Sequence, residues 1–295
     1  MATYLPRIRT RLMIHAHRKV LGLLDGEYAS VQTGRSMDFH DLREYVPGDD
    51  VKDIDWKATA RSRSLLVKRF TAERQHLVLL AISTGRSMAA QATGTTTKRE
   101  LAIFTAGLVG WLGVRHGDKV AVVYGDSETQ KLTKSADTEV ALERALGQAH
   151  DAITPDSAEA DIVAVLRHIA TNVRRRAILL VVTDEHSVSD EMAAVLRRLT
   201  VQHEVLVAGI DDLDPTTAVP GGAPTVDIDT VSALPGWLTG DSVLQAQYAE
   251  LAAAEEHGLR GTLDRLGIAY QRVQDDATAI GAVFHLLQRH RHARR

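Results

Sequence analysis

Two runs of uninterrupted apolar residues constrain the fold of this chain more than any other feature. Residues 77–82 read Leu-Val-Leu-Leu-Ala-Ile, and residues 177–183 form a second run of the same kind. Runs of this length without alternating polar positions are typical of strands that helices cover on both faces. Further strands are expected at residues 119–124, 129–132, 204–210 and 268–273. The pattern therefore predicts parallel strands at the centre of a sheet.

Segments with helical periodicity lie between these strands. We expect helices at residues 5–24, 97–116, 138–150, 158–173, 189–200 and 241–266, and a last one from residue 275, with Gly267 just after the sixth. The alternation predicts an α/β fold, a doubly wound and mainly parallel sheet flanked by helices. Residues 215–238 are the least regular internal stretch and are expected to be an ordered excursion from this sheet.

Composition excludes several classes of function. With 44% hydrophobic and 25% charged residues the chain is globular, and its formal net charge of −3 gives no reason to expect a nucleic-acid partner. It has no cysteine, which excludes disulfides and thiolate chemistry and is typical of a cytoplasmic protein. The apolar stretch at residues 101–114 is shorter than the roughly 20 residues that span a bilayer, so we expect no integral membrane segment.

The segment from residue 38 to residue 74 has neither a helical nor a strand period. It alternates acidic and basic residues, and it holds four aromatic residues, at Phe39, Tyr45, Trp56 and Phe70. This spacing of aromatic rings and opposite charges indicates a loop that holds a defined shape. Within it, Pro-Gly at residues 47–48 predicts a tight turn, because Pro fixes one backbone angle and Gly permits the next.

Four short motifs occur in this segment in one order and spacing: Arg43-Glu44-Tyr45, Pro47-Gly48-Asp49-Asp50, Ile54-Asp55-Trp56 and Thr59-Ala60-Arg61. They resemble the signature of the domain-of-unknown-function 58 family, whose members place it just before a von Willebrand factor type A domain. The resemblance covers roughly residues 22–266. It implies a binding or assembly role, often beside MoxR-type AAA+ ATPases, and no established reaction.

We accordingly expect two parts in the chain. Residues 1–75 are predicted to form an N-terminal helix and the signature segment, packed on the main domain, and residues 76–295 a von Willebrand factor type A-like domain with a basic C-terminal tail. In the tail, His285, His290 and His292 lie among arginines. A nucleic-acid-binding arm is one interpretation, but we favour a solvated helix end whose bases suit the helix dipole.

The resemblance also implies a site at the carboxyl ends of the strands. There, von Willebrand factor type A domains bind a divalent cation with an Asp-x-Ser-x-Ser loop, a downstream Thr and a further Asp. The loop in this chain reads Ser-Thr-Gly-Arg-Ser at residues 83–87. Ser83 and Gly85 therefore replace two of the ligands, and Ser87 matches the third.

Of the two remaining ligand positions, the threonine is lost and the final aspartate is kept. The downstream Thr aligns best with Ala160, although Thr154 or Ser157 would serve if the loop were shifted, and Asp184 matches the final acid. Loss of a carboxylate weakens attraction for a cation, and Arg86 adds a positive charge beside the vacancy. We therefore expect no metal ion and no other cofactor. If a metal were retained, its remaining ligands would be Ser87 and Asp184.

The same rim of the sheet is the predicted site for a protein partner, with Arg86 in place of the cation. Its residues are Ser83, Gly85, Arg86, Ser87 and Asp184. The alternative is a displaced metal site, in which Asp184 and Glu185 join Asp211, Asp212 and Asp214. Acids that follow a strand are more often turn and helix-cap residues, which argues against a metal there.

For the signature segment two interpretations stay open. A salt-bridged segment that clamps the N-terminal helix to the sheet is the interpretation we favour, because Trp56 and Tyr45 are costly to leave exposed. The alternative is a docking surface that presents Arg43, Asp49, Asp50, Asp55 and Arg61. The candidate residues of the segment are Arg43, Tyr45, Pro47, Gly48, Asp49, Asp50, Asp55, Trp56 and Arg61.

No sequence motif indicates catalysis. The chain has no nucleophile elbow, phosphate-binding loop or zinc-binding helix, and Lys98 lacks the spacing of a phosphate-loop lysine. The function predicted is therefore a non-enzymatic protein-interaction module, and the resemblance implies a MoxR-type AAA+ ATPase as its partner. A metal-dependent ligand-binding domain is the alternative, and a hydrolase or a nucleic-acid-binding protein ranks lower.

Overall fold

A computed structural model of the protein describes residues 4–15, 23–26, 28, 38–46, 49, 54–62, 64–71, 75–93, 95–184, 188–216, 225–239 and 241–292. Its main feature is a six-stranded sheet in the order β5-β4-β3-β6-β7-β8. The strands are β3 (Leu77–Ser83), β4 (Lys119–Gly125), β5 (Gln130–Leu132), β6 (Ile178–Thr183), β7 (Glu204–Ile210) and β8 (Ala269–Val273). Only β5 pairs antiparallel; the other pairings in this sheet are parallel.

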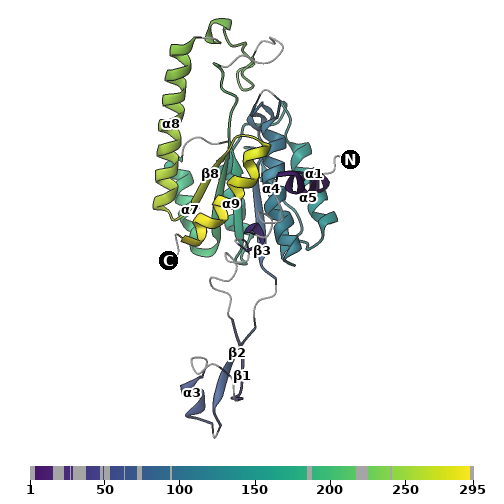
Figure 1. Ribbon diagram of the computed structural model, residues 1–295, viewed down its shortest axis with the longest axis vertical. Helices are drawn as coiled ribbons and strands as arrows, with labels where there is room; N and C mark the ends of the chain where they lie inside the picture. The colour runs from purple at the N-terminus through teal and green to yellow at the C-terminus, as the bar shows by residue number, and fades with distance from the viewer. Residues whose placement is uncertain are drawn as a thin grey trace.

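Helices cover both faces of this sheet (Figure 1). One layer holds α1 (Tyr4–His15), α4 (Lys98–Arg115), α5 (Glu139–Ala152) and α9 (Asp276–His292); the other holds α6 (Ile162–Asn172), α7 (Asp190–Gln202) and α8 (Ser242–Arg265). Strand β3 serves both layers, because Leu80 faces the first and Leu79 the second, and neither is more than 1% exposed. The predicted doubly wound, mainly parallel sheet is confirmed.

The strand order creates a switch point at the centre of the sheet. From β3 the chain builds outward through β4 and β5 to one edge, and from β6 it builds through β7 and β8 to the other. The connection that follows β3 therefore leads toward one edge of the sheet, and the connection that follows β6 leads toward the other. In open sheets of this kind, ligands bind beyond the carboxyl ends of the strands at that point.

Helix α1 packs on the main sheet domain. Leu5 and Ile8 are buried, at 3% and 0% exposure, in the same core as α4 and α5. Ile8 lies against Gly107 of α4, where an added Cβ would come within 2.5 Å of the Ile8 Cδ1 atom. The backbone N–H of Leu5 also donates to Glu143 of α5 at 2.9 Å. The predicted helix extended to residue 24, but residues 16–22 lie outside the described part of the chain.

The signature segment contains regular structure that its sequence pattern did not predict. Strands β1 (Asp38–Glu44) and β2 (Leu66–Thr71) form an antiparallel hairpin, and the short helix α3 (Trp56–Thr59) lies beside it. Asp55 begins α3 by accepting the backbone N–H groups of Lys57 and Ala58, both at 3.0 Å. An isolated hairpin covers no large core, so it needs no strict apolar alternation. Figure 1 shows it at the lower end of the molecule, apart from the sheet. The division into residues 1–75 and 76–295 stays a prediction.

The last third of the chain also follows the expected pattern. Residues 225–239 form an irregular excursion with an isolated bridge between Val226 and Ala233 and the 3-10 helix η3 (Gly236–Leu238). After α8, Gly267 adopts a positive φ of 71°, the left-handed conformation expected of a helix C-terminal glycine. Among the described residues, every helix is too short or too polar to cross a membrane.

Candidate functional site

Three acidic residues and a lysine converge at the carboxyl ends of β6 and β7. Asp184 directly follows β6, and Asp211 and Asp212 directly follow β7. The side chain of Lys98 enters from the start of α4, and its Nζ atom donates to Asp184 Oδ2 at 2.9 Å and forms an ion pair with Asp212. Lys98 is only 3% exposed and Asp184 only 8%. The centre of the rim is therefore an ion triad in which Lys98 and Asp184 are buried and the Asp212 side chain is 33% exposed.

Local structure fixes where the Lys98 side chain starts. Thr97 is the N-cap of α4 and forms a capping box with Glu100, in which each side chain accepts a hydrogen bond from the other residue's backbone N–H. The backbone N–H of Lys98 donates to the Ala90 carbonyl at 2.9 Å. A lysine in the first turn of a helix is disfavoured by the helix dipole. The ion pairs with Asp184 and Asp212 offset that penalty and stabilise the charged Lys98 side chain at this position.

The charge state of the triad follows from opposing effects on Lys98. Burial lowers the pKa of its ammonium group, but the negative charges of Asp184 and Asp212, together with their hydrogen bonds, outweigh burial and raise the pKa above its ordinary value. Lys98 is thus a cation at neutral pH. Two carboxylates share this one positive charge.

The residues at this rim do not fit a bound divalent cation. The Lys98 ammonium group forms an ion pair with the carboxylate of Asp184, which is the acid that the resemblance assigns to the metal. Ser83 stands where that pattern has its leading carboxylate. Within the described ranges, no group of three or more His, Asp or Glu side chains is arranged to hold a metal ion. The positive charge at the rim comes from a side chain.

Gly85 has a steric reason to lack a side chain. A Cβ atom at this position would lie 2.3 Å from the Cα atom of Ala160, far inside contact distance. The backbone N–H of Arg86 also donates to the Ala158 carbonyl at 2.9 Å, which holds the two loops together. Ala160 thus faces the β3 loop, at the position that the sequence assigns to the absent threonine. The two alternatives, Thr154 and Ser157, hydrogen-bond to each other at 3.1 Å.

Arg86 does not take the place of the cation beside Asp184. Its guanidinium group pairs with Glu159 and with Asp229, each at 3.0 Å. The cation that contacts Asp184 belongs to Lys98 instead. Arg86 therefore ties the β3 loop to the excursion at residues 225–239.

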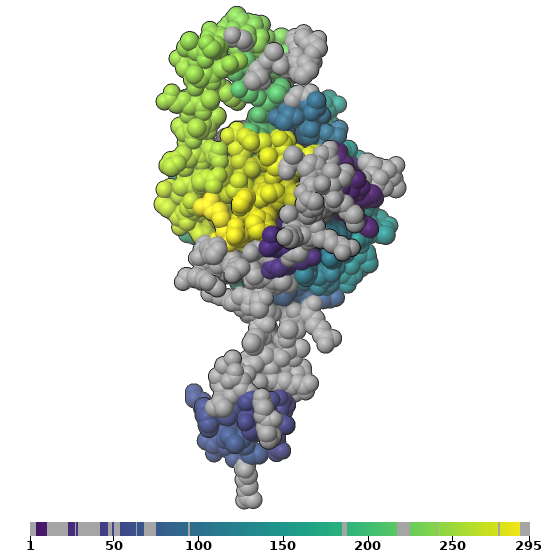
Figure 2. Space-filling view, in the orientation of Figure 1, coloured from purple at the N-terminus to yellow at the C-terminus, as the bar shows by residue number. Residues whose placement is uncertain are grey.

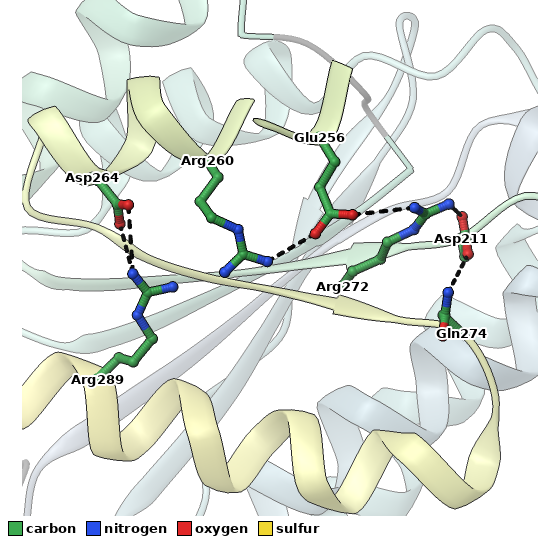
Figure 3. Close-up of polar contacts among 7 residues, drawn as sticks. All are labelled: Asp211, Glu256, Arg260, Asp264, Arg272, Gln274 and Arg289. Atoms are coloured by element: carbon green, nitrogen blue, oxygen red, sulfur yellow. Dashed lines mark hydrogen bonds and ion pairs between the residues drawn. The ribbon is translucent and has the colours of Figure 1, made fainter. Parts of the chain in front are cut away.

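The acids that follow β7 have separate partners. Asp211 pairs with Arg272 and accepts a hydrogen bond from Gln274 at 3.3 Å (Figure 3). Asp214 accepts the backbone N–H of Thr216 at 2.8 Å and its hydroxyl at 2.6 Å, as a turn residue does. Of this cluster, Asp212 shares the Lys98 ammonium with Asp184, and Glu185 lies outside the described residues. The described acids of the displaced metal site are thus held by other partners in this geometry.

Two serines of the β3 loop have buried hydroxyl groups without a hydrogen-bond partner in the described structure. These are Ser83 Oγ, in a residue of 0% exposure, and Ser87 Oγ. Ser87 is the loop residue that matches the metal-binding pattern. Its hydroxyl is buried and has no hydrogen-bond partner among the described residues, so a binding role for Ser87 stays a prediction.

The described signature residues lie on the β1–β2 hairpin or in the connection between its strands, away from the rim (Figure 1). Arg43 binds Asp49 with both terminal nitrogens, at 2.8 and 2.6 Å, and this hydrogen bonding holds the pKa of Asp49 below its ordinary value. Asp55 caps α3. Trp56 is 63% exposed, which corrects the expectation that it is covered. Tyr45 is half-buried and Arg61 exposed; Pro47, Gly48 and Asp50 lie outside the described residues.

Lys98 is the site residue that sequence reasoning missed. Its only local signal is a basic residue directly after an N-cap threonine, where the helix dipole disfavours a cation. That signal says that an acidic partner is needed but does not say which one. The partners are 86 and 114 positions along the chain and come together only in the folded sheet.

Two mycobacterial relatives match most of the chain at low identity. The chain is 24% identical over 274 residues to the uncharacterized proteins Mb1516 of Mycobacterium bovis and Rv1480 of Mycobacterium tuberculosis, and the match covers 90% of this chain and 83% of each relative.

Solved structures of similar shape share less sequence. An aerotolerance-related membrane protein from Bacteroides fragilis matches with a TM-score of 0.41 at 18% identity, over 72% of this chain and 98% of that protein. A von Willebrand factor type A protein from Catenulispora acidiphila matches with a TM-score of 0.41 at 14% identity, over 74% of this chain and 43% of that one. The fold assignment stands on the strand order without these likenesses.

A family model matches a continuous part of the chain that includes both the signature segment and the ion triad. It covers residues 41–257, well over half of the sequence. The chain therefore belongs to the family described as "Protein of unknown function DUF58".

Proposed function

We propose that this chain is a non-enzymatic protein-interaction module that binds its partner at the rim of the sheet without a resident metal ion. The observation that carries the proposal is the Lys98 ammonium group between Asp184 and Asp212. It supplies, from within the chain, the positive charge that a metal-dependent domain takes from solution. A rim built in this way keeps its charge and shape whatever the metal concentration.

Exposed charges around the triad give a partner something to bind. The Arg86 side chain is 29% exposed, and its two partners Glu159 and Asp229 are 75% and 57% exposed. Charged groups at such a rim contribute more to orientation and partner choice than to raw affinity. This favours an ordered docking contact over a site for chemistry.

The partner we propose is a MoxR-type AAA+ ATPase, with which the chain would act in the assembly or maturation of another complex. The support is the signature at residues 43–61, which resembles that of proteins associated with such ATPases. A cytoplasmic location belongs to the same proposal and is supported by the absence of cysteine.

The test is co-purification of the tagged chain with the MoxR-type ATPase of the same organism, with ATP or ADP present. We expect recovery of the ATPase with ATP, and a reduction of about tenfold for Arg86→Ala, equivalent to ~1.4 kcal/mol. Arg197→Ala, which removes an exposed arginine of α7, is the matched control and should leave recovery unchanged. Equal recovery with Arg86→Ala would place the contact elsewhere.

A further inference from the structure

One stretch of the chain has a strongly one-sided charge. Residues 211–257 contain nine Asp and Glu residues and no Lys or Arg, although the whole chain has 35 basic and 38 acidic residues. The described residues 225–239 and 241–257 form the excursion and the N-terminal two thirds of α8. We call this part the acidic arm.

The acidic arm has little support from the rest of the protein. All residues of α8 are described, and the buried ones are Leu259 and Leu263, near its C-terminal end. Figure 1 shows the N-terminal part of α8 continuing past the end of the sheet, and Figure 2 shows this part standing clear of the main body on the visible face. Against the described residues, this 24-residue helix thus buries side chains only near its C-terminal end.

The arm also exposes large apolar side chains. Trp237 is 67% exposed and Leu251 is 64% exposed. Other apolar residues of the arm with at least half of their surface exposed are Val226, Val231 and Val243. Single exposed apolar residues are ordinary, but several on one protruding element indicate a surface that a partner covers.

A pocket lies between α8 and the ends of β7 and β8. Its charged lining consists of the carboxylates of Asp211, Asp212, Glu255 and Glu256 and one guanidinium group, that of Arg272. The Tyr248 ring also lines it, and burial, followed by repulsion from Asp212, Asp214 and Asp211, raises the pKa of Tyr248. Carboxylates thus outnumber the one guanidinium group in the lining of the pocket, and its wall is partly apolar because Leu251 and Leu259 contribute to it.

Internal ion pairs neutralise only the deeper acids of this surface. Figure 3 shows Arg272 between Asp211 and Glu256, and Arg260 on the other side of Glu256. Glu250 and Glu255, by contrast, are exposed and have no ion-pair partner among the described residues. Negative charge is therefore left on the exposed surface of α8, with Glu255 at the pocket itself.

We propose that the acidic arm is a docking surface for a segment of a protein partner that combines Arg or Lys with apolar side chains. The basic group enters the pocket beside Glu255, and the apolar groups cover Leu251 and Trp237. The charge of the arm repels nucleic acid and anionic lipid, which leaves a basic protein segment as the occupant. The inference rests on the proposed function and extends it, because the Arg86–Asp229 pair joins the arm to the rim.

The experiment uses fluorescence anisotropy with a labelled amphipathic peptide of Leu and Arg, and a second peptide with Glu in place of each Arg. We expect the full-length chain to bind the first peptide and not the second. Glu250→Lys/Glu255→Lys should weaken binding at least about tenfold. The control Glu128→Lys/Asp156→Lys reverses two exposed acids near the other edge of the sheet and should change affinity less than about twofold.

Three outcomes overturn the proposal. Equal weakening by both double variants would mean a general charge effect. An unchanged affinity for Glu250→Lys/Glu255→Lys would exclude the arm. Sedimentation showing wild-type oligomers that the arm variant dissociates would assign the surface to a second copy of the chain. Circular dichroism of each variant verifies that it is folded. The proposed function is tested by a different result. It is wrong if the tagged chain recovers no ATPase while peptide binding at the acidic arm is intact.

Discussion

Lys98 Nζ lies 2.9 Å from Asp184 Oδ2 and joins the start of α4 to the end of β6 across the switch point of the sheet. The side chains are 4% and 7% exposed, so the pair is shielded from water. Buried charges of this kind are costly to separate, because removal of one partner leaves the other unpaired in a poorly polar environment. The pair therefore holds the geometry of the rim.

Asp184→Asn is expected to destabilise the protein by about 1–3 kcal/mol, because Lys98 keeps its buried charge and retains only Asp212 as a charged partner. Chemical denaturation measures the change in the free energy of unfolding. Asp264→Asn is the matched control, since it removes an acid from an exposed pair with Arg289 (Figure 3) and should cost less than about 1 kcal/mol. Similar losses in the two variants would show that the Lys98 pair is no more important than a surface pair.

The Lys98–Asp184 coupling can be isolated by a double-mutant cycle with Lys98→Met and Asp184→Asn. We expect the double variant to be less destabilised than the sum of the single variants by about 0.5–3 kcal/mol, the range for residues in direct contact. Strict additivity would mean that the two side chains act independently and that the ion pair does not form in solution.

Mg²⁺, Mn²⁺ and Ca²⁺ are each expected to leave the melting temperature of the wild-type chain unchanged, because the Lys98 ammonium competes with them for Asp184. A cation that bound would stabilise the folded state by about 2.7 kcal/mol at a hundredfold excess over its dissociation constant. The double variant Ser83→Asp/Lys98→Ala restores a carboxylate and removes the ammonium group, and should gain a metal-dependent increase in melting temperature. A shift in the wild type that Asp184→Ala abolishes would contradict the assignment of Lys98.

The sheet could be predicted from sequence because burial of a strand on both faces produces a continuous run of apolar residues. The run at residues 77–82 lies within β3, and the run at residues 177–183 contains β6, since strands covered by helices on both sides favour apolar residues at successive positions. Gly267 was identified for a similar reason, because the positive φ after a helix requires a residue without a side chain. These features depend on a residue and its near neighbours.

The ion triad and the hairpin could not be predicted in this way. The pairing of Lys98 with Asp184 and Asp212 depends on which strand ends meet, and spacing along the chain carries no trace of it. In the hairpin, the size and apolar character of Trp56 predict that it is covered, yet the small β1–β2 unit buries Ile54 and Val67 and leaves Trp56 exposed. The metal-binding pattern showed which ligands were absent, but it did not identify the cation that takes their place.

Gly85→Ser tests whether the β3 loop has lost the metal-binding serine for steric reasons. The new Cβ would lie 2.3 Å from the backbone of Ala160, which cannot move as a flexible side chain can. We expect a loss of about 1–3 kcal/mol in the free energy of unfolding, the usual cost of overpacking. Gly281→Ala in α9 is the control, because nothing lies within 4 Å of its added Cβ, and it should be neutral or stabilising. An unchanged stability for Gly85→Ser would mean that the two loops separate readily.

His203, at the end of α7, should make the stability of the protein depend on pH. It is 2% exposed, both its ring nitrogens lack hydrogen-bond partners in the described structure, and burial, followed by repulsion from Arg176, lowers its pKa below the ordinary 6.5. Below pH 6.5 the unfolded chain takes up a proton that the folded chain refuses, so stability falls as the pH falls, by up to about 1.4 kcal/mol per pH unit. Denaturation midpoints between pH 7.5 and 5 measure this slope. His203→Leu should flatten the profile, whereas His257→Gln, at an exposed position of α8, should leave it unchanged. Parallel profiles for the wild type and His203→Leu would assign the acid sensitivity to other groups.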